Sequence, residues 1–227
     1  GECMPQKNSR KEYGADGYYH IYNRGVEKRT IFMDEMDYKT FIGYMKLYLS
    51  PPNMQGNKLK DPSGRTIPPS QSPNNYVDEI ELIAYCLMPN HFHIFIRQIS
   101  DRGMASFMQS LTQRYVMYFN KKYMRVGGLF QSRYKTVRVM DERQFTYITK
   151  YIHRNPLEIL PKGPGPVGLQ SYKYSSYGNY LGLFSQSWVK TEDVLSYFSR
   201  RNSRDTYRAF VEETGGLETV YEEMMDM

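Results

Sequence analysis

Two histidines separated by one bulky residue form the pattern in this chain with the clearest chemical potential. His91, Phe92 and His93 stand in the apolar run PNHFHIFI. Side chains alternate between the two faces of a β-strand, so both imidazoles would project from one face, about 7 Å apart along the strand. Two imidazoles on a rigid strand can bind one divalent metal ion. The alternative is a pair of ordinary polar residues on a half-buried strand, and the pattern alone leaves both interpretations open.

A cysteine shortly before this pair widens the choice of metal. Cys86 could complete a three-ligand zinc site with His91 and His93. A lone cysteine in an apolar segment is more often a small buried residue. The chain has only two cysteines, which excludes a disulfide scaffold and a four-cysteine zinc site and is typical of a reducing compartment.

A tyrosine and an amide at helical spacing form the second candidate site. Asp141, followed three residues later by a glutamine, predicts the start of a helix over residues 141–154. Tyr147, Tyr151 and Asn155 follow one another at intervals of four, along one edge of the apolar stripe of that helix. A tyrosine on this edge could face an active site across a sheet, or it could be a boundary residue with its hydroxyl in water.

Charge indicates a polyanionic partner. The formal net charge is +6 and the sequence pI is about 9.1, for which nucleic acid is the first candidate ligand. Residues 103–140 hold seven basic residues and no acidic one, interleaved with aromatic residues. Basic groups neutralise phosphates and rings stack on unpaired bases, so the segment predicts binding of single-stranded nucleic acid, with a merely solvated helix face as the alternative. The basic residues in question are Arg114, Lys121, Lys122, Arg125, Arg133, Lys135 and Arg138.

The elements that must position these residues follow from periodicity and turn residues. We expect strands over residues 17–23, 80–88, 91–98 and 129–140, and helices over residues 34–49, 103–123 and 141–154. This order predicts an α+β fold, a ferredoxin-like (RRM-like) antiparallel sheet with helices packed on one face. Two short helical segments near residues 191–199 and 204–213 predict a small, mostly helical C-terminal extension.

Composition divides the chain into three parts. Residues 1–16 read as a flexible polar tail that is neither a signal nor a transit peptide. Residues 17–160 form the main domain, interrupted by a proline-rich loop insertion at 51–79, and residues 161–227 form the extension. The apolar runs are too short for a transmembrane helix, so we expect no membrane partner and a cytoplasmic, nucleoid-associated protein.

Four blocks of sequence together resemble a known family. In chain order they are YHIYNRGVEKRTIF, AYCLMPNHFHIFI, GGLFQSRYKTVRV and YITKYIHRNPLEI. Their order and spacing resemble the single-tyrosine HUH transposases, named for a histidine–hydrophobic–histidine motif, and more closely their REP-associated tyrosine transposase branch. The resemblance covers about residues 17–160, and the stretch YSSYGNYLG looks like the C-terminal extension of that branch.

The resemblance implies roles for the two candidate sites. His91 and His93 match the HUH pair and would hold a Mg²⁺ or Mn²⁺ ion. Asn155 stands where the family places an amide or similar polar group as third ligand. Tyr151 matches the nucleophile. No aspartate or glutamate next to the HUH pair is an evident general base.

Other residues in the blocks have less definite roles. His20 and Arg24 match the N-terminal block, which implies a place near the site or the DNA, with His20 as a possible accessory residue. Tyr147, on the same helix edge, and Tyr134, in the basic segment, compete for the role of nucleophile. The alignment of the blocks favours the tyrosine in KYIHRNP.

The activity that the resemblance implies is that of a transposase. It is a metal-dependent single-stranded DNA endonuclease and strand transferase with a 5′-phosphotyrosine intermediate, acting on hairpin-bearing DNA. A monomer that uses its own tyrosine is favoured over a dimer with exchanged tyrosine helices. The alternative is a non-catalytic hairpin DNA- or RNA-binding protein derived from the same fold. Replication initiators and relaxases share the chemistry, but they are usually longer and often carry two tyrosines or a third histidine.

Overall fold

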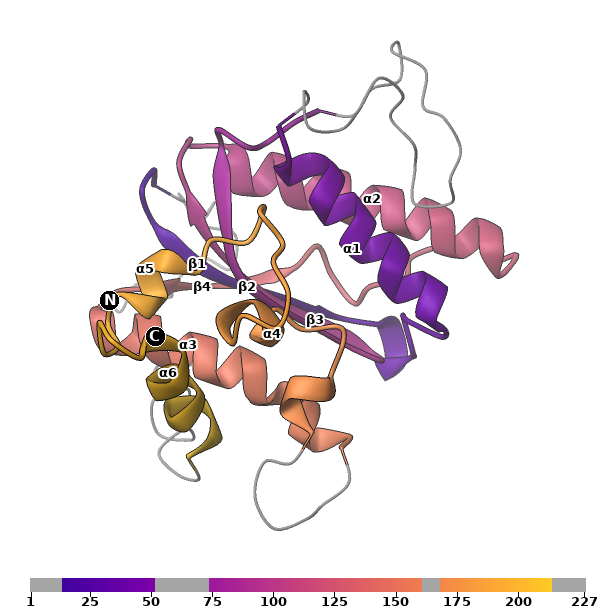
Figure 1. The fold of residues 1–227 in the computed structure, drawn as a ribbon. Coiled ribbons are helices and arrows are strands. Elements are labelled where there is room, and N and C mark those ends of the chain that lie inside the picture. Colours follow the sequence, from indigo (N-terminus) through magenta and orange to yellow (C-terminus); the bar gives the residue numbers. More distant parts are fainter. Residues whose placement is uncertain (1–13, 52–73, 161–167, 214–227) are drawn as a thin grey trace, which may run out of the picture.

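A four-stranded antiparallel sheet forms the centre of the fold (Figure 1). The structure is a computed structural model that describes residues 14–51, 74–160 and 168–213. The strand order is β2-β3-β1-β4, with β1 at Tyr18–Arg24, β2 at Ile80–Met88, β3 at His91–Gln98 and β4 at Lys135–Val139. The first helix joins β1 to β2 and the second joins β3 to β4, which confirms the predicted ferredoxin-like α+β fold.

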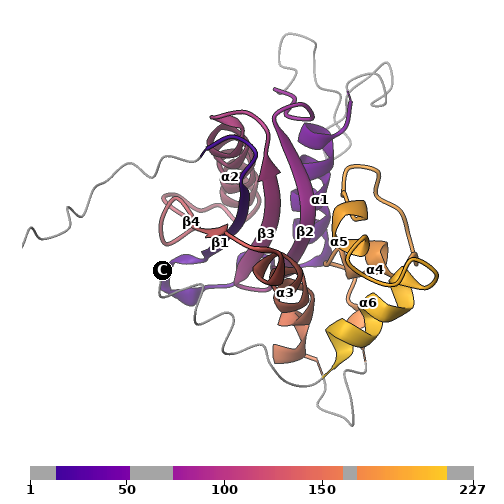
Figure 2. The same cartoon turned by 90° about the vertical axis from the view of Figure 1, so that its left-hand side faces the viewer.

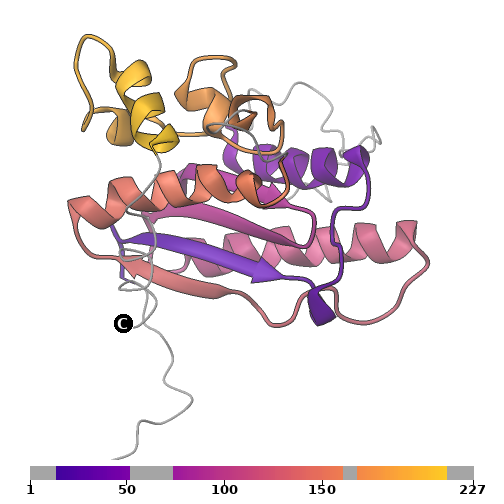
Figure 3. The same ribbon diagram turned by 90° about the horizontal axis from the view of Figure 1, so that it is seen from below.

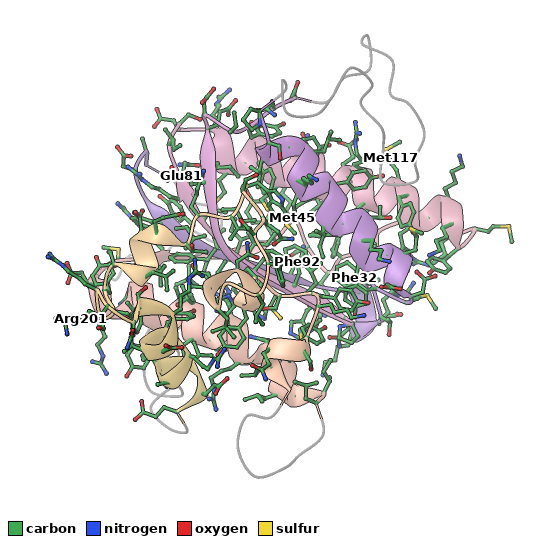
Figure 4. All side chains as sticks on the ribbon, in the orientation of Figure 1. Phe32, Met45, Glu81, Phe92, Met117 and Arg201 are labelled. Atoms are coloured by element: carbon green, nitrogen blue, oxygen red, sulfur yellow. The ribbon has the colours of Figure 1, made fainter. Side chains whose placement is uncertain are left out.

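Two long helices cover one face of this sheet. They are α1 (Glu35–Leu49) and α2 (Gly103–Lys122), which contribute to one apolar core with the sheet. Asp34 is the N-cap of α1, because its carboxylate accepts a hydrogen bond from the Asp37 backbone while the Asp37 carboxylate accepts one from the Asp34 backbone. Figure 4 shows Met45 and Phe92 in the interior of the molecule and Met117 on the outward side of α2.

The third long helix, α3 (Glu142–Arg154), lies on the other face of the sheet (Figure 3). The apolar stripe of this helix, formed by Phe145, Ile148 and Ile152, packs in a second core that includes Phe95 of β3. The prediction of helices on one face therefore holds for α1 and α2 and is corrected for α3. The physical reason is that β2 is buried along almost its whole length, so both faces of the sheet require cover.

The C-terminal segment covers the same face as α3. It comprises the turn η5 (Leu169–Ser171) and the short helices α4 (Tyr177–Tyr180), α5 (Glu192–Leu195) and α6 (Ser203–Glu212), which gather beside α3 in Figure 2. Isolated bridges join Leu82 to Val189 and Cys86 to Ser175, so this segment also lies along the β2 edge. The described part of the extension, residues 168–213, contains short helices, and it shares the second core with the main domain.

The last strand is shorter than the sequence suggests. β4 begins at Lys135, and Phe130 forms only an isolated bridge with Gly25. Between them, the Asn23 side-chain amide donates to the backbone oxygens of Ser132 and Arg133, at 2.9 and 2.6 Å, in place of a regular ladder. Most of the predicted N-terminal tail (1–13) and proline-rich loop (52–73) lie outside the described residues. Within the described ranges, no helix is both long and apolar enough to cross a bilayer.

Candidate active site

The HUH histidines project from β3 toward α3. His91 and His93 pair in register with Arg24 and Tyr22 of β1, whereas Phe92 between them points into the core under α1 and α2. The two imidazole ring centroids are 5.1 Å apart, and the ring planes are nearly perpendicular, at 89°. The alternation expected of a strand thus places both rings on the face that α3 covers.

Helix α3 places the predicted nucleophile and third ligand beside these rings. The half-buried Tyr151 ring meets His93 edge-on, with 5.3 Å between the ring centroids. Asn155, just after the end of α3, is buried, and its Oδ1 lies 3.3 Å from Nε2 of His91. Tyr151, Asn155 and both histidines line one cavity of about 230 Å³. The four residues that the sequence singled out therefore meet at one place.

The hydrogen bonds around His91 fix which atoms face each other. The Asn155 amide nitrogen donates to the Tyr151 carbonyl at 3.0 Å, which leaves Oδ1 directed at His91. The Asn90 amide nitrogen donates to the Lys28 carbonyl, so its Oδ1, at 2.7 Å, accepts the proton on Nδ1 of His91. Burial lowers the pKa of His91 below its ordinary value of 6.5, which favours the neutral ring at pH 7. With its proton on Nδ1, the neutral ring has a lone pair on Nε2.

Two lone-pair atoms at 3.3 Å, Nε2 of His91 and Oδ1 of Asn155, cannot hydrogen-bond each other in this protonation state. They are instead suited to share a cation. Among the residues described, no three histidine, cysteine, aspartate or glutamate side chains are arranged to hold a metal ion. A bound ion would therefore depend on the amide oxygen of Asn155 as its third protein ligand. An imidazole–amide set of this kind suits a weakly held divalent ion with open positions for phosphate and water.

A third imidazole, that of His20, contacts the ring of His93. Nε2 of His20 and Nδ1 of His93 are 2.9 Å apart, and both side chains are buried. Burial lowers the pKa of His20 to about 3 and the pKa of His93 well below its usual value, so both rings are neutral at pH 7. His20, predicted only as an accessory residue, thus lies in direct contact with the HUH pair.

The competing candidates are not assembled at this site. Cys86 is fully buried in the second core, burial raises the pKa of its thiol, and it does not line the cavity. The zinc alternative therefore has no geometric support in the described part of the chain. Tyr147 packs edge-on against Phe210 of α6, and Tyr134 packs against the core under α1 and α2. Neither tyrosine lines the cavity, whereas Tyr151 does.

The cavity rim carries charge of both signs. Arg24 and Lys135, two of the predicted DNA contacts, line it, and the Lys135 ammonium lies 5.9 Å from the centre of the Tyr22 ring. Glu158 also lines it, although the sequence showed no acidic residue near the histidines. The turn η4 (Asn155–Glu158) brings this carboxylate to the site, and its spacing of three residues from Asn155 was the signal available in the sequence.

The remaining predicted DNA contacts lie elsewhere. Four of them belong to α2 and the turn after it, on the opposite face of the sheet: Arg114, Lys121, Lys122 and Arg125. The Lys122 ammonium is paired with Asp34 at 2.7 Å and with Asp37 at 2.8 Å. Burial opposes its charge, but the hydrogen bonds to these carboxylates raise the pKa of Lys122. The charge of Lys122 is thus paired with two carboxylates of the same chain, while Arg133 and Arg138 are exposed beside and on β4.

Comparison with known proteins adds independent information. Residues 74–155 match the family model described as "Transposase IS200 like". The predicted resemblance is confirmed. The matched segment contains both HUH histidines, the tyrosine of KYIHRNP and Asn155, and it supports a transposase-like function in DNA recombination.

A solved structure is also similar to the chain. It is that of a REP-associated tyrosine transposase bound to a REP hairpin, with a TM-score of 0.49 and 14% sequence identity. The similarity covers 82% of this chain and 92% of that one. No curated protein matches the chain.

Proposed function

We propose that this protein is a metal-dependent single-stranded DNA endonuclease and strand transferase that acts on hairpin-bearing DNA through a 5′-phosphotyrosine intermediate. One observation carries the proposal. Side chains from β3 and α3 converge on a cavity of about 230 Å³ that contains a tyrosine, two neutral imidazoles and an amide oxygen. The family match over residues 74–155 supports the same conclusion.

The Tyr151 hydroxyl is the proposed nucleophile. Its oxygen attacks the scissile phosphorus, the bond from phosphorus to the 3′ oxygen breaks, and the phenol proton leaves to water as the 3′ oxygen takes one up. The products are a 5′-phosphotyrosine and a free 3′-hydroxyl. Because phenolate is a far better leaving group than an alkoxide, a 3′-hydroxyl can reverse the step and rejoin strands without ATP.

The residues proposed to hold Mg²⁺ or Mn²⁺ are His91, His93 and Asn155. When bound, the ion supplies Lewis-acid stabilisation of charge on the scissile phosphate and the departing oxygen. The chain's own contribution is orientation. The Asn90 side chain fixes the proton of His91, and the Tyr151 carbonyl fixes the amide of Asn155. Nε2 of His91 and Oδ1 of Asn155 are thereby directed at one point before DNA binds.

The rim suits a single strand of DNA. Arg24 and Lys135 line the cavity and place positive charge where phosphates would approach the tyrosine. The Tyr151 ring lies 5.3 Å from the His93 ring of the same chain. This distance supports a monomer that uses its own tyrosine rather than an exchanged helix.

The test is formation of a covalent adduct. A DNA hairpin with single-stranded flanks is incubated with Mn²⁺ and the full chain, then separated on a denaturing gel. We expect an adduct that carries the 3′ label of the strand, and release of the 5′-labelled fragment with a free 3′ end. Tyr151→Phe removes one oxygen atom and should abolish the adduct.

Tyr147→Phe is the matched control, since Tyr147 lies one turn earlier on α3 and faces Phe210. This variant should form the adduct normally. An adduct that survives Tyr151→Phe would remove Tyr151 from the role. Hairpin binding that is insensitive to EDTA, without cleavage of any strand, would favour the non-catalytic binding protein instead.

A further inference from the structure

The imidazole rings of His20 and His93 are in direct contact at the wall of the candidate site. His20 stands on β1, with Tyr22 on the same face, and its side chain is fully buried. The ring of Tyr22 lies 5.2 Å from that of His20, and the ring of Tyr151 lies edge-on at 5.9 Å. The imidazole of His20 is thus enclosed by the residues of the cavity wall.

The geometry is that of a hydrogen bond between two imidazoles in nearly one plane. The N···N distance is 2.9 Å, the ring planes differ by 15°, and the ring centroids are 5.1 Å apart. The centroid separation exceeds the N···N distance by about the radii of the two rings, as a bond within the ring planes requires. In face-to-face stacking, the two ring centroids would instead be about as close to each other as the nitrogen atoms are.

A hydrogen bond between two ring nitrogens contains one proton, and a ring that binds a metal ion must keep a lone pair on its other nitrogen. The position of the shared proton therefore decides which nitrogen of His93 is available. If His20 donated, the proton of His93 would sit on Nε2, and that atom could not bind a metal ion. If His93 donates from Nδ1, its Nε2 is free to do so. His91 provides the parallel, since Asn90 accepts its Nδ1 proton and leaves Nε2 facing Asn155.

We propose that His20 is a positioning residue that accepts the Nδ1 proton of His93 and so presents the Nε2 lone pair of His93 to the metal position. This inference rests on the proposed function, because it assigns His93 as a metal ligand. The chain then fixes its two ligand imidazoles in the same tautomer by different means. Asn90, the neighbour in sequence, acts on His91, whereas His20, from another strand, acts on His93.

The first experiment reads the tautomer directly. The full chain, without metal, is labelled with ¹⁵N-histidine, and the ring nitrogens are assigned by NMR. The chain has only four histidines, and the signals lost in a His93→Gln variant identify His93. We expect the proton of His93 on Nδ1. A proton on Nε2 would overturn the inference, whatever the protein does to DNA.

The second experiment measures Mn²⁺ affinity by titration, followed by electron paramagnetic resonance, with near-ultraviolet circular dichroism as the check on folding. His20→Met fills the space without an acceptor at the same position, and we expect a loss of roughly 10- to 100-fold in affinity. His20→Gln places an amide oxygen near the position of Nε2 and should recover most of that loss. Equal affinities of the wild type and a folded His20→Met variant would overturn the inference.

The outcomes separate this inference from the proposed function. If Mn²⁺ binds and responds to His20 but no covalent adduct forms, the endonuclease proposal fails and the positioning role stands. If the wild type binds Mn²⁺ no better than His91→Ala, the metal dependence of the proposed function fails. The NMR spectrum of the wild type then decides the role of His20.

Discussion

The buried side chain of His153 links α3, the helix that carries the proposed nucleophile, to the C-terminal extension through hydrogen bonds. In His153, Nδ1 lies 2.7 Å from the Tyr207 hydroxyl and Nε2 lies 2.8 Å from the Ser176 hydroxyl. The side chain is fully buried, and burial lowers the pKa of His153 to about 3. We predict that His153→Gln makes the stability of the protein less dependent on pH below neutrality.

The direction and size of this effect on the free energy of unfolding follow from proton linkage. The ordinary pKa of histidine is 6.5, so below that pH the unfolded chain binds a proton that the folded chain excludes until about pH 3. The contribution of His153 is therefore fully present above pH 6.5 and is lost as the pH falls. The loss is about 1.4 kcal/mol per pH unit, which amounts to about 2 kcal/mol at roughly pH 5. His20 is subject to the same linkage, but it is present in both proteins and cancels in the comparison.

The assay is urea unfolding of wild type and variant at about pH 7.5 and about pH 5. The free energy of unfolding should fall by about 2 kcal/mol less in His153→Gln than in the wild type. Tyr207→Phe is the control. It leaves a buried imidazole nitrogen without its partner, so it should cost about 1–3 kcal/mol at both pH values while the pH dependence remains. Equal pH dependence of the wild type and His153→Gln would refute the reasoning.

Three further predictions concern DNA binding, metal binding and the backbone. Lys135→Gln, on the cavity rim, should weaken single-strand binding and reduce its salt dependence by about one phosphate contact, whereas Lys122→Gln should lower stability and leave DNA affinity unchanged. Equal effects of the two variants on DNA affinity, in titrations at several salt concentrations, would contradict this prediction. Asn155→Ala should lower Mn²⁺ affinity by roughly a hundredfold, and an unchanged affinity would exclude this amide as a ligand. Gly103→Ala would place a Cβ 2.5 Å from a backbone oxygen and should cost about 1–3 kcal/mol in thermal unfolding, whereas Gly128→Ala, with 3.9 Å to the nearest atom, should not.

Local patterns in the sequence were sufficient for most elements. Apolar runs bounded by turn residues predicted residues 80–88 and 91–98 as strands, and periodicity predicted the helix over residues 34–49 that is observed as α1. These signals are carried by neighbours in the chain. The short helix α4 was not predicted, because its four residues contain too little periodicity to be recognised.

The placement of α3 could not be predicted in the same way. A stripe such as Phe145, Ile148 and Ile152 shows that a helix packs on a sheet, but it does not show on which face. The near-continuous apolar run of residues 80–88 was the available sign that both faces are covered. That face matters, because it is the one from which His91 and His93 project.

The sequence indicated the main residues of the candidate site, but it did not indicate the contacts between them. The spacing of the histidines and the match of the tyrosine block indicated the main residues. The contact of His20 with His93 depends on the pairing of β1 with β3, which joins residues 73 positions apart. The ion pair of Lys122 with Asp34 likewise joins distant positions, so a count of basic residues could not identify Lys122 as already neutralised.

The shared core under α3 constrains how a protein of this kind can change its length. Ile83 and Met88 of β2 are buried in the same cluster as Tyr180 and Tyr207 of the C-terminal segment. A chain cut after residue 160 would present these apolar side chains to water and invite aggregation. Descendants that lose the segment would need polar replacements on β2 at the same time, so the shortened form is separated from this one by several coupled mutations.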